Sequence, residues 1–375
     1  MLPPKLWTPL IGILAFVAAA CGGSSASDTA PHGTAHPDAP SAYALGEFPE
    51  FPHGSLPRST TAALQAALDS TVEDGTFTGV TAAVIVADRG SWSGAAGSLD
   101  GVPLTQASRL PTHSAGKTIV AAEILRLVED GKLGLDDQAS DHLPPELRFF
   151  DANGATIRQV LAMRSGIPDL KEFTSEGSFY PAERASTAVE LFKKLPEPEV
   201  GPGSETGYAS TNYVLLGTII EHAAGRPLAE VLRSDVLDHP GVEGLVYTVE
   251  DALAADGYGV ESAPASLARW GYELYGGFVI SEASLREMTH FYQDPCCDMR
   301  YGLGVFDFSV DYDTLAVGHE GESSTATCCS SILLVALPEE GVVVSVQANT
   351  AGTSTSDPFS HVQFLTQVLK DAAQE

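Results

Sequence analysis

Residues 111–130 read PTHSAGKTIVAAEILRLVED, an apolar segment that opens with a group of polar side chains. Apolar residues recur at helical spacing from residue 115 to residue 130, and Gly131 follows as a stop signal. The segment predicts a buried helix whose first turn carries Ser114 and Lys117 in the spacing Ser-x-x-Lys. Because residues three apart share a helix face, we expect the Lys117 amine to reach the Ser114 hydroxyl.

A serine and a lysine in this arrangement are typical of nucleophilic catalysis. A serine hydroxyl is a weak nucleophile, and a lysine desolvated by neighbours such as Ile119 and Val120 has a lowered pKa and acts as its base. Ser114 also falls at the helix N-terminus, where backbone N–H groups stabilise a developing oxyanion. His113 would point about 100° away around the helix, so we do not expect it to be the base.

Other readings of the same segment find less support. Residues 116–118, Gly-Lys-Thr, end like a phosphate-binding P-loop, but the required earlier glycine is Pro111 here. The chain contains no Gly-x-Ser-x-Gly elbow and no His-Glu-x-x-His motif, so no motif supports α/β-hydrolase or zinc-protease chemistry. Ser-x-x-Lys alone is a common pattern and leaves the function open.

Two further stretches supply the context. Residues 202–222 read PGSETGYASTNYVLLGTIIEH, and residues 318–321 read Gly-His-Glu-Gly after a strand-like run. Together with the Ser114 segment, and in that order, they closely resemble the serine β-lactamase and penicillin-recognising hydrolase family. The resemblance is to its branch of class C β-lactamases, D-Ala-D-Ala carboxypeptidases and esterases, and it covers about residues 60–370.

The resemblance implies that Ser114 is the nucleophile and that Lys117 and Tyr208 move protons to and from it. A phenol in this role needs a nearby cation to lower its pKa, which Lys117 would supply. Tyr208 matches the family's tyrosine because flanking residues fall in register, namely Pro202, Gly203, Tyr213 and residues 219–221.

In the third motif, the resemblance places His319 at the basic position of the family's Lys/His-Thr-Gly pattern. Gly321 would let the substrate lie close to the backbone. The amide N–H of Glu322 would complete an oxyanion hole with that of Ser114.

Two residues that would contact the substrate depart from the family pattern. The family's Tyr-x-Asn ends in Ser210 here, so a short hydroxyl replaces an amide that usually holds the amide side chain of the substrate. The family's central threonine in the third motif is Glu320. A carboxylate aimed into the site would oppose a substrate carboxylate by about 1–3 kcal/mol. Both changes favour esters or small amides over β-lactams.

The rest of the pattern predicts a mixed α/β fold. Strand-like runs at residues 79–87 and 92–97 lie near the N-terminus, and further strand-like runs between residues 302 and 347 precede a closing helix at 356–373. The middle of the chain is mostly helical. We expect one β-lactamase-like antiparallel sheet built from both termini and flanked by helices, with an inserted, mostly helical lobe.

The N-terminal region predicts export. An apolar run at residues 10–20 suits the core of a signal peptide and falls short of the roughly 20 residues that span a bilayer. Three alanines before Cys21 resemble a bacterial lipoprotein signal, in which Cys21 becomes the lipidated first residue, with an ordinary secretory signal as the alternative. We therefore expect a signal peptide over 1–20, a flexible linker over 21–57 and a hydrolase domain over 58–373.

Four cysteines form two adjacent pairs, Cys296-Cys297 and Cys328-Cys329. In an exported protein an even number predicts disulfides, and we expect the first pair to bond to the second because bonds between neighbours are strained. A zinc site is the alternative, although adjacent cysteines lack the spacer that lets both thiolates reach one metal.

The chain has 49 acidic against 20 basic residues and a net charge of −29, which disfavours binding to nucleic acid. We predict an exported serine hydrolase, anchored by lipid in the cell envelope, that forms an acyl-enzyme on ester or small amide substrates without a cofactor or metal. The alternatives are a D-Ala-D-Ala carboxypeptidase or weak β-lactamase, and a non-catalytic binding or sensing module. The natural substrate and the oligomeric state stay open.

Overall fold

The computed structural model describes residues 45–169, 187–293, 300–324, 328–351 and 358–374. The expected signal peptide, Cys21 and most of the linker lie outside these ranges, and so do Cys296 and Cys297. The side chains of Cys328 and Cys329 are not described either. The disulfides and the lipid anchor therefore stay predictions.

The described residues form a nine-stranded sheet in the order β3-β2-β1-β12-β11-β10-β9-β8-β7, with antiparallel pairing throughout. Strand β1 near the N-terminus pairs with β12 near the C-terminus, from Gly79 opposite Asn349 to Val86 opposite Val342. The expected sheet built from both termini is confirmed. Its strands are β1 Gly79–Val86, β2 Gly90–Leu99, β3 Val102–Pro103, β7 Tyr292–Gln293, β8 Arg300–Tyr301, β9 Phe306–Asp307, β10 Val317–Ser324, β11 Cys328–Leu337 and β12 Val342–Ala351.

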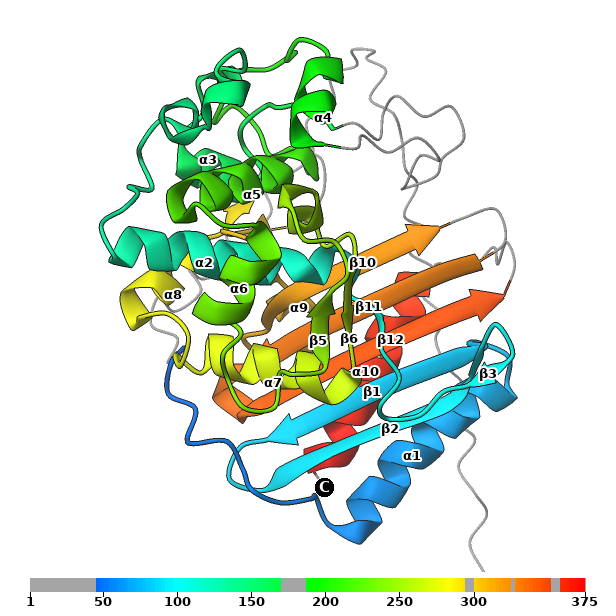
Figure 1. Cartoon of the computed structure of the whole chain (residues 1–375). Coiled ribbons are helices and arrows are strands. Elements are labelled where there is room, and N and C mark those ends of the chain that lie inside the picture. Colours follow the sequence, from blue (N-terminus) through cyan, green and yellow to red (C-terminus); the bar gives the residue numbers. More distant parts are fainter. Residues whose placement is uncertain (1–44, 170–186, 294–299, 325–327, 352–357, 375) are drawn as a thin grey trace, which may run out of the picture. The chain divides into compact units, whose positions relative to one another are not determined.

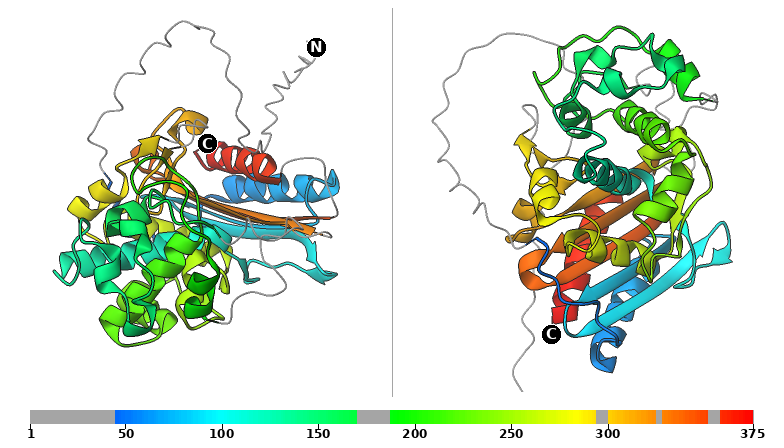
Figure 2. Two further views of the ribbon diagram at one scale, coloured as in Figure 1. Left: turned by 90° about the horizontal axis from the view of Figure 1, so that it is seen from above. Right: turned by 60° about the vertical axis from the view of Figure 1, so that its left-hand side comes forward.

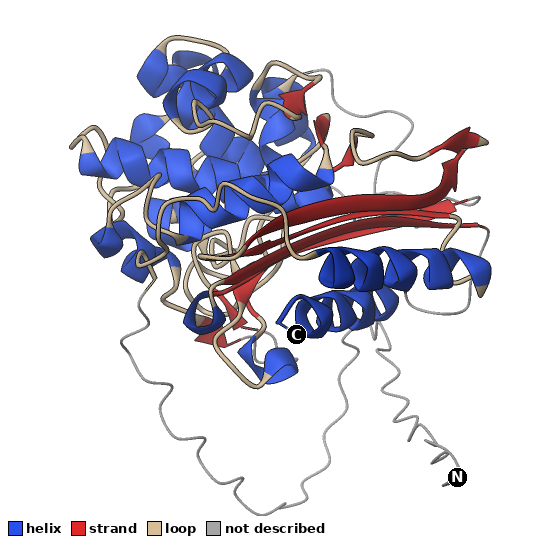
Figure 3. Cartoon of the chain, turned by 90° about the horizontal axis from the view of Figure 1, so that it is seen from below, coloured by secondary structure: helices blue, strands red, loops and turns tan. Residues whose placement is uncertain are grey.

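Helices cover both faces of this sheet (Figure 1). Helices α1 (Arg58–Glu73) and α10 (Pro358–Gln374) lie side by side on one face, as Figures 2 and 3 show. Leu64 and Leu68 of α1 are one helical turn apart and fully buried, so the apolar stripe of α1 faces the sheet.

The helical lobe lies over the opposite face (Figure 3). It carries a small three-stranded sheet in the order β4-β6-β5. The expected inserted lobe is confirmed, and its elements include α2 Lys117–Glu129, α3 Ile157–Leu161, α4 Ala188–Lys194, α5 Thr211–Ala224, α6 Leu228–Asp235, α7 Pro264–Tyr275, α8 Glu282–Met288, β4 Leu110–Pro111, β5 Leu245–Tyr247 and β6 Val260–Ser262. The short helix α9 Ser309–Tyr312 lies on the other face, where Asp311 bonds to Gln363 and Tyr312 lies near Thr366 of α10.

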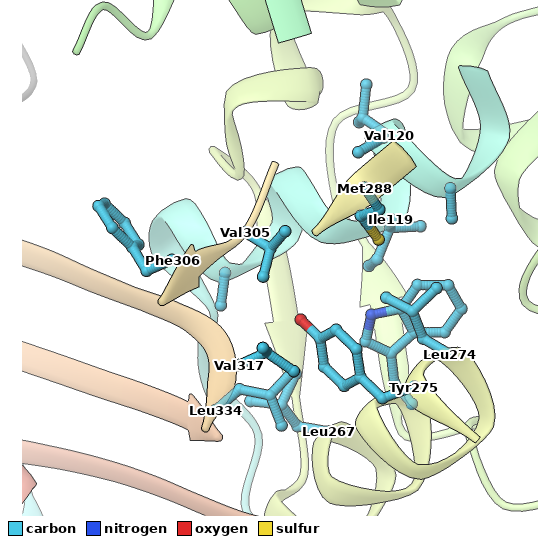
Figure 4. Packing of buried hydrophobic residues seen from close by; sticks show 14 of the residues in the cluster. Ile119, Val120, Leu267, Leu274, Tyr275, Met288, Val305, Phe306, Val317 and Leu334 are labelled. Atoms are coloured by element: carbon cyan, nitrogen blue, oxygen red, sulfur yellow. The ribbon is translucent and has the colours of Figure 1, made fainter. Parts of the chain in front are cut away.

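The predicted apolar helix is α2, on the side of the lobe that faces the sheet (Figure 1). Its Ile119 and Val120 are fully buried in the same cluster as Tyr275 of α7 and Val317 of β10 (Figure 4). The indole of Trp270 in α7 also donates to the Thr118 hydroxyl at 2.9 Å. These contacts fix the first turn of α2 relative to the sheet.

The start of the helix differs from the expectation. Residues His113–Gly116 form a 3₁₀ turn, and the α-helix begins only at Lys117. Within the described ranges, no helix has both the length and the apolar character needed to cross a membrane.

Candidate active site

The serine and the lysine of the first motif are in contact. Lys117 Nζ donates to Ser114 Oγ at 2.8 Å across the junction of the 3₁₀ turn and α2. The Lys117 side chain is fully buried. The motif spacing therefore places an amine against a serine hydroxyl in a desolvated environment, which is the arrangement that activates a nucleophile.

The nitrogen of Lys117 is surrounded by oxygen atoms and by two tyrosine rings. Besides Ser114, Nζ donates to the Asp256 carbonyl oxygen at 2.8 Å and to Ser210 Oγ at 3.4 Å. These oxygen atoms hold the Lys117 nitrogen in place beside Ser114 Oγ. The rings of Tyr208 and Tyr213 flank the same nitrogen, with centroids at 5.3 and 5.7 Å.

Tyr208 joins this group from the loop before α5. Burial raises the pKa of Tyr208 well above its usual range, the hydrogen bond with Ser114 acts in the opposite direction, and the charges of Glu320 and Asp169 raise it further. The pKa of Tyr208 in the free site is therefore raised, and not lowered as we expected, because desolvation is the largest cause. Tyr208 carries its proton and can serve as a donor.

His319 lies on β10, with its ring centroid 6.4 Å from that of Tyr208. Its Nδ1–H donates to the Glu320 carbonyl at 2.5 Å, which leaves Nε2 to accept from the Tyr301 hydroxyl at 3.1 Å. Complete burial lowers the pKa of His319 to about 3, and the charge of Lys117 lowers it as well. The ring at the motif's basic position is thus neutral near pH 7 and works through hydrogen bonds.

The backbone of β10 runs directly beside the nucleophile. A Cβ atom at Gly321 would lie 2.8 Å from the Ser114 amide nitrogen and 2.9 Å from Cγ2 of Ile332. Only glycine fits this approach without displacing the backbone. Glu322 follows it on the strand, and its carboxylate accepts from the Ser331 hydroxyl at 3.2 Å.

The two positions that depart from the family pattern also lie near the catalytic group. Ser210 Oγ contacts Lys117, as described above, and Glu320 is half-buried and close enough to influence Tyr208. The neighbouring Asn212 is buried, and its Oδ1 accepts from Ser165 Oγ at 2.5 Å. Asn212 therefore has a structural role and does not replace the missing asparagine.

Two residues of the site were not found from the sequence. Asp256 contributes its main-chain carbonyl, for which no side-chain signal exists. Asp169 is buried near Tyr208, and only its place just after the Ser-Gly-Ile-Pro stretch at residues 165–168 could have drawn attention to it.

A cavity of about 710 Å³ lies elsewhere, among the starts of α1 and α7 and strands β1 and β2, with Arg58 and Trp92 in its lining. None of the residues around Ser114 lines it. In the parts of the chain that the structure describes, no three His, Cys, Asp or Glu side chains gather in a way that could hold a metal ion.

Comparison with known proteins identifies the family. The Beta-lactamase family model matches residues 64–362, so the chain belongs to that family. This is a family of serine β-lactamase-like and penicillin-binding-like hydrolases, and the resemblance and the β-lactamase-like fold expected from the sequence are confirmed.

Sequence relatives match parts of the chain. Protein flp of Staphylococcus aureus (strain COL) is 34% identical over 108 residues, which are 28% of this chain and 21% of that protein. Penicillin-binding protein 4 of Amycolatopsis lactamdurans is 29% identical over 157 residues, 41% of this chain and 40% of that protein. The chain thus spans well under half the length of these curated relatives.

Solved structures match most of the described fold. A D-stereospecific amidohydrolase from Streptomyces sp. has a TM-score of 0.64 at 25% identity, covering 81% of this chain and 97% of that one. The D-amino acid amidase from Ochrobactrum anthropi SV3, complexed with L-phenylalanine, has a TM-score of 0.69 at 19% identity, covering 84% and 98%. The second likeness concerns the fold alone.

Proposed function

We propose that this protein is an exported serine hydrolase that forms an acyl-enzyme on Ser114 and acts on esters or small amides. The observation that carries the proposal is the 2.8 Å hydrogen bond between Lys117 Nζ and Ser114 Oγ in a buried setting. Tyr208 is the second proton carrier, and its hydrogen bond with Ser114 supports this role.

The proposed reaction assigns each group one step. Lys117, in its amine form, removes the hydroxyl proton as Ser114 Oγ bonds to the carbonyl carbon of the substrate. The amide N–H groups of Ser114 and Glu322 receive the negative charge that develops on the carbonyl oxygen. Tyr208 passes its proton to the departing alcohol or amine and recovers one from Lys117. Water then hydrolyses the acyl-enzyme through the same groups in reverse.

Two features support neutral substrates over penicillins. Glu320 brings a negative charge to the position where the family has a hydroxyl, and Ser210 is directed to Lys117 rather than offering an amide. One solved neighbour is a D-stereospecific amidohydrolase, which supports small amides beside esters. The alternative, a D-Ala-D-Ala carboxypeptidase or weak β-lactamase, draws support from the penicillin-binding relative.

A substrate panel tests the proposal. Purified protein is assayed with a chromogenic short-chain ester, a D-amino acid amide and a penicillin, each beside the Ser114→Ala variant. We expect turnover of the ester or amide that Ser114→Ala abolishes. Faster turnover of penicillin would favour the alternative, and absence of turnover and acylation with all three would favour a binding or sensing module.

The double variant Glu320→Thr with Ser210→Asn tests the substrate class. Removal of a like charge of about 1–3 kcal/mol predicts roughly 5- to 150-fold faster acylation by penicillin, with a larger gain at low salt. Turnover of a neutral ester should change far less. An unchanged rate with penicillin at every ionic strength would show that Glu320 does not select against anions.

Export and lipid anchoring at Cys21 belong to the same proposal, supported by the apolar run and the alanines before Cys21. In a bacterial host that processes lipoproteins, the protein should fractionate with membranes. The Cys21→Ser variant should be released from them. Equal fractionation of both proteins would contradict the anchor.

A further inference from the structure

His113, the residue before the nucleophile, has an unusual backbone. Its φ angle is +46°, in the left-handed region of the backbone that residues other than glycine rarely adopt. The side chain is 6% exposed, so the ring is enclosed by protein. Strained residues beside a reacting group persist only when their surroundings hold them in place.

Contacts from three distant parts of the chain hold His113. Its ring nitrogen Nε2 lies 2.7 Å from the hydroxyl of Ser330 on β11. A Cβ atom at Gly257 would lie 1.7 Å from the His113 carbonyl oxygen, and one at Gly321 would lie 2.7 Å from the His113 Cβ. The backbone of His113 thus fits between Gly257 and Gly321 because neither has a side chain. The hydrogen bond between the His113 ring and Ser330 connects it to the sheet.

The same contacts surround the amide of Ser114. Its nitrogen would lie 2.8 Å from a Cβ at Gly321 and 3.2 Å from a Cβ at Gly257. The peptide between His113 and Ser114 carries this N–H group, so the backbone angles of His113 set the direction in which the N–H points. That direction matters because an oxyanion donor must aim at the place where the negative charge develops.

We propose that His113 is a positioning residue, whose hydrogen bond to Ser330 holds the left-handed backbone that aims the Ser114 amide into the oxyanion hole. This inference rests on the proposed function. A neutral ring suits the role, because burial and the nearby Lys117 lower the pKa of His113 to about 4. His113 therefore acts through Ser114 and exchanges no proton with the substrate.

Ser330→Ala is the mildest test, because it removes one hydroxyl and leaves the His113 ring and backbone in place. We expect kcat for a neutral ester to fall about 10- to 100-fold with little change in KM, as when an oxyanion donor is misaligned. His113→Ala should lose a similar factor. The double variant should lose no more than His113→Ala, because both changes remove one shared hydrogen bond. Ser330→Thr, which keeps a hydroxyl, should stay within about threefold of the parent.

His142→Ala is the matched control, since the His142 ring bonds to Asp137 at 2.9 Å and belongs to another part of the lobe. Its kcat should equal that of the parent. Ser330→Ala with an unchanged kcat, or losses that multiply in the double variant, would overturn the role of His113. If the parent protein itself neither turns over esters nor is acylated, the proposed function fails instead.

Discussion

Helix α2 contains two buried charged residues that the structure treats differently. Lys117 at its start is fully buried and donates to Ser114, Ser210 and the carbonyl of Asp256. Glu123, about two turns later, is 1% exposed, and its Oε2 has no hydrogen-bond partner among the described residues. Arg126 Nε lies 4.0 Å from this oxygen.

The contrast shows two ways to bury an ionisable group. At Lys117 the chain supplies acceptors and places the amine where a nucleophile needs it. At Glu123 burial raises the pKa to about 7, and the charge of Asp235 raises it further, so the carboxyl group is largely neutral below that pH. Lys117 is thus buried with hydrogen-bond acceptors around its nitrogen, whereas Glu123 is buried with an ion pair at 4.0 Å and an oxygen that lacks a hydrogen bond within the described part of the chain, which costs stability.

Replacing Lys117 should give the largest effect on activity. Lys117→Ala removes the base and should lower the acylation rate by at least about 10³-fold. Lys132→Ala is the matched control, because Lys132 is exposed and pairs with Asp130 at 3.1 Å, away from Ser114. The rate of ester turnover measures both. Nearly full activity in Lys117→Ala would remove the distinction between the two ends of α2.

Tyr208→Phe should give the next largest effect. It removes the proton carrier but keeps the ring beside Lys117, so we expect kcat to fall about 10²-fold. The effect should be larger for an amide than for an ester with a good leaving group, since the amine needs the proton more. Tyr272→Phe, which loses only a hydrogen bond to the Pro49 carbonyl at 2.9 Å, is the control. Equal losses for both substrates would argue against proton donation.

Glu123→Gln should change stability and leave activity alone. Because the folded pKa of Glu123 is raised, its contribution to stability is present below its unfolded pKa of 4.5 and is lost as the pH rises through about 7. The substitution should therefore raise the free energy of unfolding by about 1–3 kcal/mol at pH 8, with a gain that shrinks toward pH 4.5. Denaturant unfolding at several pH values measures this.

Glu129 on the same helix is the matched control. Its burial acts to raise the pKa, but hydrogen bonds from Ser284 and Ser281 lower it below the usual value. Glu129→Gln should therefore destabilise the protein at pH 8, opposite in sign to Glu123→Gln. The same sign for both variants would contradict the account of these two carboxyl groups.

Features set by nearby residues were predictable from the sequence. The spacing of Ser114 and Lys117 fixes their contact within one turn, and strand-like runs near both ends of the chain located the sheet. The family resemblance placed the strand that carries Gly321 at the site, and in the structure Gly321 lies beside Ser114.

Features set by distant residues were not predictable. The Asp256 carbonyl that accepts from Lys117 is 139 residues away, and Ser330 is 217 residues from His113. The raised pKa of Tyr208 depends on burial that only the folded chain creates. The sequence therefore indicates which residues we propose as catalytic groups, whereas the protonation states of Tyr208 and His319 depend on tertiary packing.

Mass spectrometry of the intact protein after treatment with a fluorophosphonate tests the central claim most directly, because this reagent bonds to activated serines. We predict one adduct per chain, mapped by digestion to the peptide that contains Ser114, and no adduct on Ser114→Ala. A chain that takes up no reagent, or an adduct that persists in Ser114→Ala, would contradict the assignment of Ser114 as the nucleophile.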